Sequence, residues 1–398
     1  MNQTETVIAL TERYVANTYR RYPVALTKGA GCRVWDIEGK GYLDFVGGIA
    51  VCTLGHVHPR LTQAIQAQAG QLLHVSNLYH IPTQAALAQL LCEHSFADRV
   101  FFCNSGAEAN EAAIKLARKY ATEHLAADRA EIITMRGSFH GRTIATLTAT
   151  AQEKYQRGFG PLLPGFTYVP FDDLESVERA MDSGTAAVLV EPVQGEGGVR
   201  LPSEGYLAGL RKLCDDRDAL LIFDEIQTGM GRTGTLFAYQ RSGIEPDILT
   251  LAKGLAGGLP IGAMLAREEV MAVLTPGTHA TTFGGNPLVT AVGLATLTTI
   301  LDEGLPAQAA ARGRYLLDAL ERLRQKYPIV KEVRGAGLLV GIELTTEARP
   351  LTVECLSRGL LVSTAGETVV RMVPPLIVSE LEIDEALAIL DQGLTALC

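Results

Sequence analysis

Apolar runs of five to seven residues alternate with helical stretches through most of the chain. Runs this short, with few polar positions, are typical of strands that are buried on both faces. Their alternation with helices favours a mostly parallel sheet that helices cover on both sides. The sequence therefore predicts an α/β fold. The predicted strands span residues 99–103, 131–135, 186–192, 219–225 and 247–251.

The pattern changes toward both ends of the chain. Near the N-terminus, a short helix from Thr4 to Ala16 precedes a hairpin with its turn at Glu38-Gly39. Near the C-terminus, a helical pattern over 287–326 precedes a strand pair and a last amphipathic helix. We expect the two ends to form a smaller α+β domain together. The predicted boundaries are 1–55 for the N-terminal segment, 56–290 for the large domain and 291–398 for the C-terminal part.

Composition narrows the class of protein. The chain has 398 residues, of which 47% are hydrophobic and 20% charged, so it can bury a substantial core. Its net charge of -9 is spread without a Lys/Arg cluster, which argues against nucleic acid as a partner. The start lacks a secretory signal pattern and no apolar run is long enough to span a bilayer, so we expect a cytoplasmic protein without a membrane partner. Seven separated cysteines without a CxxC pair indicate free thiols and no zinc site.

Two of the predicted strands end beside groups that can carry chemistry. The run at 219–225 ends in Asp224 and Glu225, and the run at 247–251 ends just before Lys253. Open α/β sheets bind ligands at the carboxyl ends of their strands, so neighbouring strands would bring Asp224 and Lys253 into one cleft. Apolar surroundings would lower the pKa of this lysine and let its amine attack a carbonyl. The alternatives are solvated acids at a strand end and a lysine whose ammonium reaches the surface.

Three further segments follow strands or precede helices. Residues 104–107 lead through small side chains into a helix, whose first turn suits a phosphate, although a plain Ser cap fits equally well. Phe139 could stack on a planar ring and Arg142 could hold a carboxylate, unless this loop is only surface. Thr281 and Thr282 offer donors to an anion, although a polar turn would look the same.

A possible nucleotide motif has the wrong context. The stretch GMGRTG at 229–234 satisfies G-x-G-x-x-G, and Asp247 follows near the spacing of a ribose-binding acid. The glycines do not follow a strand directly, and only a short helical pattern comes after them. This argues against a nicotinamide-dependent dehydrogenase. An inactive scaffold is also disfavoured, because it would have lost Lys253 or Asp224.

Together these elements closely resemble the class III (ornithine-type) aminotransferases, which are pyridoxal-phosphate enzymes of fold type I. The resemblance extends from about residue 30 to 375, so it covers nearly the whole chain. It implies a large domain with a mostly parallel, seven-stranded type of sheet, and a homodimer whose active sites are shared. The matching stretches are NSGAEANEAAIKLARK, FHGRT, VLVEPVQGEGGV, LLIFDEIQTGMGRTGTLFAYQRSGIEPDILTLAKGLAGGLPIGAM, TTFGGNP and VRGAGLLVGIEL.

The resemblance also implies residue roles. Lys253 would form a Schiff base with pyridoxal 5'-phosphate and later move protons, and Asp224 would keep the pyridine nitrogen protonated. The implied cofactor contacts are Ser105, Gly106, Ala107, Phe139, His140, Asp224, Glu225, Ile226, Gln227, Lys253 and Thr282 of the partner subunit. The implied substrate contacts are Arg142, Thr281 of the partner subunit, Glu196 and Arg371.

Within this family, the stretches GFGPLLPGFTYVPFDD and HATTFGGNP are most similar to members that act on N2-acetylornithine. The implied ping-pong reaction moves the ω-amino group to 2-oxoglutarate, giving N-acetylglutamate 5-semialdehyde and glutamate, in arginine biosynthesis. Because one site must accept two different carboxylates, a movable Glu196 could mask Arg371 for one substrate. Other ω-amine donors stay open, namely ornithine, succinyl-ornithine, succinyl-diaminopimelate and carrier-linked lysine. The acyl pocket that would separate these donors could be lined near Tyr19, Val51 and residues 77–79.

Overall fold

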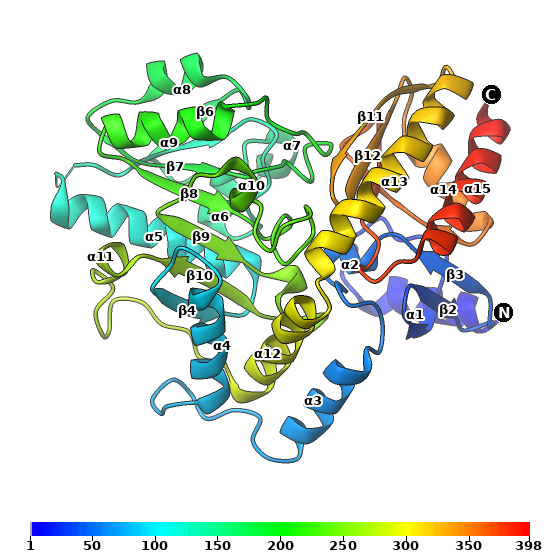
Figure 1. The fold of residues 1–398 in the computed structure, drawn as a ribbon, viewed down its shortest axis with the longest axis horizontal. Coiled ribbons are helices and arrows are strands. Elements are labelled where there is room, and N and C mark those ends of the chain that lie inside the picture. Colours follow the sequence, from blue (N-terminus) through cyan, green and yellow to red (C-terminus); the bar gives the residue numbers. More distant parts are fainter. Residues whose placement is uncertain (1, 127) are drawn as a thin grey trace.

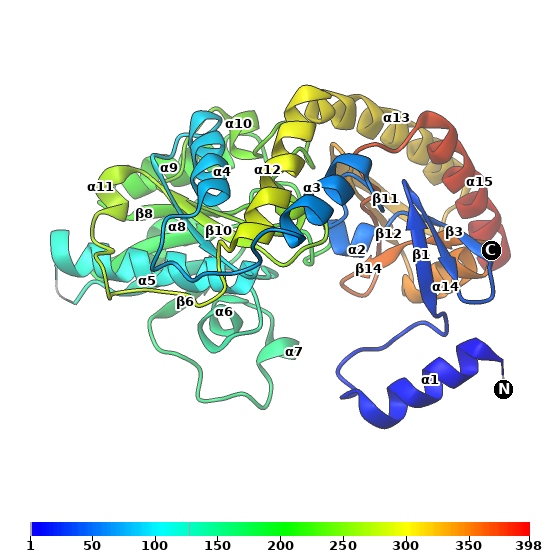
Figure 2. The ribbon, with the colours of Figure 1, turned by 90° about the horizontal axis from the view of Figure 1, so that it is seen from below.

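The computed structural model describes residues 2–126 and 128–398. These residues form two lobes, a larger one around a seven-stranded sheet and a smaller one with two four-stranded sheets (Figure 1). Helices α12 (Pro287–Asp302) and α13 (Leu305–Lys326) run from the larger lobe to the smaller one. Helix α1 (Gln3–Tyr14) lies on the outside of the smaller lobe in Figure 2, where the Thr4 amide donates to Glu38 Oε1 at 3.1 Å, and none of its residues is buried.

The large sheet confirms the predicted α/β class. All five predicted runs are strands, and two further strands, β6 and β10, complete the sheet. Strand β10 is antiparallel to both of its neighbours, whereas the pairs among β6, β5, β7, β8 and β9 are parallel. The order across the sheet is β4 (Arg99–Cys103), β10 (Gly262–Ala266), β9 (Ile248–Leu251), β8 (Leu220–Asp224), β7 (Thr185–Val190), β5 (Glu131–Met135) and β6 (Phe166–Val169).

Successive residues of the central strands belong to different core clusters. Ile222 packs in one cluster, and its neighbours Leu221 and Phe223 pack in the other. This alternation follows from the period of two in a strand, so both faces of the sheet are covered. One cluster includes α5 (Gly106–His124), α6 (Ile144–Ala149) and α11 (Glu268–Met271), and the other includes α3 (Pro59–Ala69), α4 (Pro82–Glu93), α9 (Tyr206–Asp216) and α12.

The smaller lobe joins both ends of the chain. Strand β3 (Gly41–Asp44) pairs in parallel with β13 (Leu360–Leu361), which is more than 300 residues further along. This pairing supports the expected small α+β unit, whose boundaries stay a prediction. Its remaining elements are β1 (Leu26–Ala30), β2 (Arg33–Asp36), α2 (Gly47–Ala50), β11 (Val330–Ala336), β12 (Leu339–Leu344), α14 (Arg349–Ser357), β14 (Ser363–Ala365), β15 (Val369–Met372) and α15 (Glu380–Leu397).

The long helical pattern at 287–326 is not one helix but two. Helices α12 and α13 meet at an angle of 65°, and Gly304 between them has a φ of 60°. Glycine adopts this left-handed conformation readily, and Pro306 in the next turn begins a new helix well. Among residues 2–126 and 128–398, no single helix is long and apolar enough to cross a membrane, and only this bent pair meets that test when taken together.

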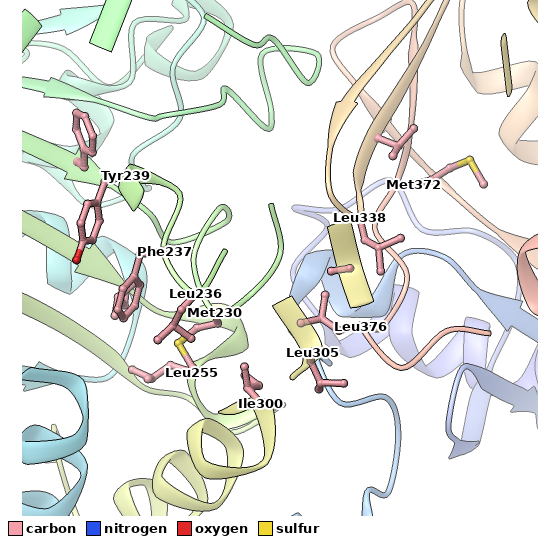
Figure 3. Packing of buried hydrophobic residues seen from close by; sticks show 14 of the residues in the cluster. Met230, Leu236, Phe237, Tyr239, Leu255, Ile300, Leu305, Leu338, Met372 and Leu376 are labelled. Carbon is pink, nitrogen blue, oxygen red and sulfur yellow. The ribbon is translucent and has the colours of Figure 1, made fainter. Parts of the chain in front are cut away.

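Apolar side chains connect the two lobes. Figure 3 shows Met230 and Leu255 of the larger lobe close to Ile300 at the end of α12, with Leu305 and Leu338 on the side of the smaller lobe. These residues belong to one continuous buried cluster. The relative position of the lobes is therefore set by packing and not only by the connecting chain.

The remaining short helices are α7 (Glu153–Gln156), α8 (Leu174–Ala180) and α10 (Tyr239–Ser242).

Candidate active site

The ends of strands β8 and β9 lie side by side. The two strands pair in parallel with Asp224 opposite Thr250, and β9 is followed by the 3₁₀ turn η1 (Lys253–Ala256). A cavity of about 400 Å³ opens here, and both Asp224 and Lys253 line it. The structure thus brings the acid and the lysine into one cleft, as the strand order predicts.

Lys253 has a side-chain amine of lowered pKa and a strained backbone conformation. Burial lowers the pKa of this lysine, and the positive charge of Arg371 adds to that effect, while Glu196, Asp224 and Glu191 oppose it. Lys253 also has a φ of 41°, a region that non-glycine residues rarely adopt. Such strain costs on the order of 1 kcal/mol and is typical of functional positions. A neutral amine is therefore more accessible here than on an ordinary surface lysine.

Asp224 is held by a buried hydrogen-bond network. Its Oδ2 accepts from Asn110 Nδ2 at 2.7 Å and lies 2.7 Å from His140 Nδ1, and its Oδ1 accepts from the Ile226 amide at 3.1 Å. Thr250 in turn donates to Asn110 Oδ1 at 2.8 Å. All five residues except Ile226 are buried. The carboxylate is thus fixed in one orientation at the floor of the cavity.

Sequence reasoning missed two members of this network. Asn110 lies on the alanine-rich face of α5, where a polar residue at a buried helical position was the available signal. Thr250 lies inside the run that became β9, where its hydroxyl gave no separate signal. His140 Nε2 is buried and has no hydrogen-bond partner among the described residues, which leaves one polar atom of the network available.

The predicted anion site at 104–107 forms the start of helix α5. Ser105 caps the helix by accepting from the Glu108 amide at 3.2 Å, and Ser105, Gly106 and Ala107 line the cavity. The first amides of a helix have no partner within it and carry partial positive charge. A Cβ on Gly106 would lie 2.7 Å from Ile226 Cδ1, so a larger residue here would require the Ile226 side chain to shift.

Residues 136–143, which we call the aromatic turn, line the cavity through Phe139, His140 and Arg142. The amide of His140 donates to Thr150 Oγ1 at 2.8 Å, which fixes the turn. The Arg142 guanidinium lies 4.1 Å from the ring centre of Tyr155, a contact that the sequence did not indicate. This cation–π contact places an exposed positive charge at the cavity wall.

Glu191 is a further acid in the cavity wall that sequence reasoning missed. It follows directly after β7, just as Asp224 ends β8, but it lies inside the predicted run 186–192, which concealed this position. Its Oε2 accepts from the Phe139 amide at 3.0 Å and its Oε1 from the Gly195 amide at 3.4 Å. Burial, followed by the negative charge of Asp224, raises the pKa of Glu191 well above its usual range.

Residues 192–200, which we call the acid loop, contain one half of an ion pair with the smaller lobe. Arg371 Nη1 on β15 donates to Glu196 Oε1 at 2.5 Å and to Gln227 Oε1 at 3.0 Å. The Arg371 side chain is 2% exposed and that of Glu196 is 21% exposed. Burial acts to raise the pKa of Glu196, but the charges of Arg371 and Lys253 outweigh it and lower that pKa. Glu196 is therefore ionised at neutral pH.

The other predicted site residues line the cavity only in part. The Glu225 carboxylate accepts from the amides of Ala238 and Tyr239 at 2.5 and 2.7 Å, and it does not line the cavity. Ile226 lines the cavity and packs on the start of α5. Thr281 Oγ1 accepts from Asn104 of its own chain at 3.2 Å, and Thr282 is exposed.

The residues proposed for an acyl pocket are only partly brought together. Val51 lines the cavity. Asn77 Nδ2 donates to the Gly284 carbonyl at 3.0 Å, so it contacts the 281–284 turn, while Leu78 and Tyr79 are exposed. Tyr19 lines a separate hollow beside α1.

The stretch GMGRTG forms turns that join the lobes. Its Arg232 is buried and donates to the carbonyls of Leu338 and Pro374 in the smaller lobe. Asp247 lies at the start of β9, the end of that strand that is remote from the cavity, and accepts from Arg211 at 2.8 Å. The geometry assigns this stretch a structural role and does not fit a dinucleotide site.

The cavity fits the pyridoxal phosphate that the resemblance implies. The unpaired amides at the start of α5 suit its phosphate, a fixed carboxylate suits its ring nitrogen, and a lysine of lowered pKa suits its aldehyde. The described residues contain no group of three or more His, Cys, Asp and Glu side chains that could hold a metal ion.

Comparison with known proteins identifies the family. The family model described as "Aminotransferase class-III" matches residues 14–394. The chain is 52% identical to an acetylornithine aminotransferase of Caldanaerobacter subterraneus, covering 98% of this chain and 99% of the relative. It is 54% identical to that of Thermosynechococcus vestitus, over 97% and 96% of the two chains. The crystal structure of the ornithine aminotransferase from Toxoplasma gondii superposes with a TM-score of 0.97 at 38% identity, covering 100% of this chain and 96% of that one.

Proposed function

The chain belongs to the class III aminotransferases, which use pyridoxal phosphate, and from this premise we propose that it transfers the ω-amino group of N2-acetylornithine to 2-oxoglutarate. The products are N-acetylglutamate 5-semialdehyde and glutamate, and the reaction serves arginine biosynthesis. The observation that carries the proposal is the single cavity where Lys253, Asp224 and the start of α5 converge. The substrate follows from relatives at about half identity over nearly the whole chain.

We propose that each wall of the cavity holds a different part of the cofactor. The amides of Gly106 and Ala107, with the Ser105 hydroxyl, would bind the phosphate. Phe139 would stack on the ring, and Gln227 would contact the ring hydroxyl. His140 and Ile226 would support the Asp224 carboxylate and the ring from beside it, since both contact Asp224 directly.

Bound pyridoxal phosphate supplies a carbonyl for the amine substrate and a ring that accepts electrons from the substrate carbon. Asp224 would hold a proton on the ring nitrogen, and its two buried donors, Asn110 and His140, keep the carboxylate aimed. The Lys253 amine would bind the cofactor covalently and then carry protons at Nζ, because its lowered pKa makes the neutral form available near neutral pH. Asp224 is 3% exposed, which limits access of water to its carboxylate.

Substrate carboxylates would be bound at two places. Arg142 at the aromatic turn would hold the carboxylate of the acylated diamine, together with Thr281 of the partner subunit. Arg371 would take the α-carboxylate of glutamate or 2-oxoglutarate. The Glu196 to Arg371 ion pair supports the proposal that Glu196 neutralises this arginine while the first substrate is bound.

We propose that the enzyme works as a homodimer in the cytoplasm, with domains at 1–55, 56–290 and 291–398. Thr282 and Phe283 are exposed on the single chain, which leaves Thr282 available to the phosphate site of a second copy. Its partners are amino acid and 2-oxo acid substrates, and neither nucleic acid nor a membrane.

Ornithine is the second candidate substrate. The structural similarity to an ornithine aminotransferase, at a TM-score of 0.97, favours it. That protein is 38% identical to this chain, below the 52% and 54% of the acetylornithine aminotransferases of Caldanaerobacter subterraneus and Thermosynechococcus vestitus. We therefore rank N2-acetylornithine first.

Two measurements test the proposal. Borohydride treatment of the purified, coloured protein, followed by peptide mass analysis, should place the mass of the cofactor on Lys253. Single-turnover absorbance changes should then be faster with N2-acetylornithine than with ornithine. A colourless protein would contradict the cofactor assignment, and a preference for ornithine would replace the first substrate by the second.

A further inference from the structure

Glu191 lies between the two segments that would recognise the substrates. One of its carboxyl oxygens accepts from the Phe139 amide in the aromatic turn, and the other accepts from the Gly195 amide in the acid loop. Arg142 is three residues from the first contact, and Glu196 is adjacent to the second. Glu191 itself follows directly after β7, so its backbone is fixed by the central sheet.

The two segments also touch each other directly. Gln194 Nε2 donates to the Arg136 carbonyl at 3.0 Å. A Cβ on Gly197 would lie 2.7 Å from the Gly137 carbonyl oxygen, so the backbones pack too closely for a side chain there. A shift of one segment must therefore be transmitted to the other.

We propose that Glu191 is a positioning residue that couples the aromatic turn to the acid loop, and thereby sets Arg142 and the Glu196 to Arg371 pair for their two substrates. The inference rests on the proposed function, because it takes these groups as the substrate contacts. Glu191 is 5% exposed, and its carboxyl is the group that bonds both segments at once.

Replacing Glu191 by Gln tests the coupling with little change in shape. The amide retains one carbonyl oxygen and places an NH₂ group against the other backbone N–H, so at least one of the two contacts is lost. Asp36→Asn is the control at another buried acid that does not line the cavity; its Oδ1 accepts from the amides of Glu38 and Lys40 and its Oδ2 from the Tyr42 hydroxyl.

The first readout is hydrogen–deuterium exchange followed by mass spectrometry on the cofactor-loaded protein. Peptides that cover 136–143 and 192–200 should both exchange faster in E191Q, and neither should change in D36N. Faster exchange in only one peptide, or in neither, would overturn the coupling.

The second readout is calorimetric binding of two unreactive ligands, glutarate and N-acetylnorvaline, which lacks the distal amine. Loss of one buried hydrogen bond predicts a rise of about tenfold in both Kd values for E191Q. Unchanged Kd values would reduce Glu191 to a purely structural group and overturn the proposal. If E191Q does not fold, E191D, whose carboxylate is one methylene shorter, replaces it with the same criteria. A wild-type protein that binds neither ligand would instead overturn the proposed function, and the inference with it.

Discussion

The two acidic groups Asp224 and Glu196 are held in opposite ways. Asp224 ends a central strand, is 3% exposed and is bonded by Asn110, His140 and a backbone amide. Glu196 lies in the acid loop, is 21% exposed at its side chain and is bonded by an arginine from another sheet. The network around Asp224 permits only one orientation of its carboxylate. The ion pair of Glu196 permits Glu196 and Arg371 to separate.

This difference matches the demands of a two-substrate reaction. Asp224, which we propose faces the cofactor, would have the same task in both half-reactions, so a rigid network would serve it. The groups that face the substrates must accept two different molecules in turn, so an ion pair between a loop and a strand of the other lobe is useful. Changes at the cavity floor should therefore slow both half-reactions alike, and changes at the ion pair should alter their ratio.

The largest effect is expected at the floor, from Lys253→Ala. Removing the amine that would bind the cofactor and carry protons should slow both half-reactions by about 10⁴-fold or more, at the upper end of what a positioned general base contributes. Single-turnover absorbance measurements with each substrate provide the test. The melting temperature should stay close to that of the wild type or rise, because the substitution removes a buried amine. A variant within tenfold of wild-type rates would contradict the role of Lys253.

Asp224→Asn should have the next largest effect. The substitution keeps the size of the side chain but removes the charge that would lie opposite the ring nitrogen, so we expect both half-reactions to slow by about 10²- to 10³-fold. The ratio of the two rates should stay within about twofold of the wild type, because the floor serves both steps. A large change in this ratio would break the proposed contrast between the floor and the ion pair.

Glu196→Ala should change the ratio of the two half-reaction rates and leave the enzyme able to transfer amino groups. Without Glu196, Arg371 stays free for an α-carboxylate, so the glutamate half-reaction should be retained while the preference for the ω-amine of N2-acetylornithine falls by about tenfold or more. Rates with both amines, measured separately, give this preference. An unchanged preference would refute the proposed masking by Glu196.

The ion pair also predicts how this preference depends on pH. The pKa of Glu196 is lowered below its usual value, so Glu196 stays ionised at every pH above that value and the pair is lost only as pH falls through the lowered pKa. The ω-amine preference should therefore be constant between about pH 6 and pH 9. A preference that titrates in this window would assign the switch to another group.

The sequence predicts the residues at the floor of the cavity better than those in its walls. Asp224 and Lys253 stand out because each follows a clear apolar run, and the order of parallel strands places such ends together. Glu191 lies inside the predicted run 186–192, so its position at a strand end became visible only when β7 was found to stop at Val190. The Arg142 contact with Tyr155 depends on how two loops fold against each other, which no local pattern determines.

The same limit applies to the fold. The period of the apolar residues predicts the central strands well, but β13 has only two residues and gives no periodic signal. The bend between α12 and α13 was missed because the apolar pattern continues on both sides of Gly304. In both cases tertiary packing decides a feature that is too short or too continuous for sequence patterns to resolve.

The smallest effects are expected from removing two hydroxyl groups, one that contacts the partner of Asp224 and one that contacts the partner of Glu196. Thr250→Val removes the 2.8 Å hydrogen bond to Asn110, and Ser363→Ala removes the 3.3 Å contact to Arg371 Nε. We expect Thr250→Val to lower the free energy of unfolding by about 1 to 2 kcal/mol, since it leaves a buried amide oxygen without its donor. Ser363→Ala should lower it by about 0.5 kcal/mol, because the lost contact is longer and only partly buried.

Urea unfolding of both variants, with the two half-reaction rates measured beside it, would compare the rigidity of the two sites directly. Thr250→Val should slow both half-reactions by a similar small factor, because Asn110 acts on them only through Asp224. Ser363→Ala should shift the ratio of the rates, because Arg371 is required more in one step than in the other. If Ser363→Ala destabilised the protein more than Thr250→Val, the arginine side would be the more rigid of the two. Specificity would then have to change through the movement of Glu196 alone, with Arg371 as its fixed partner.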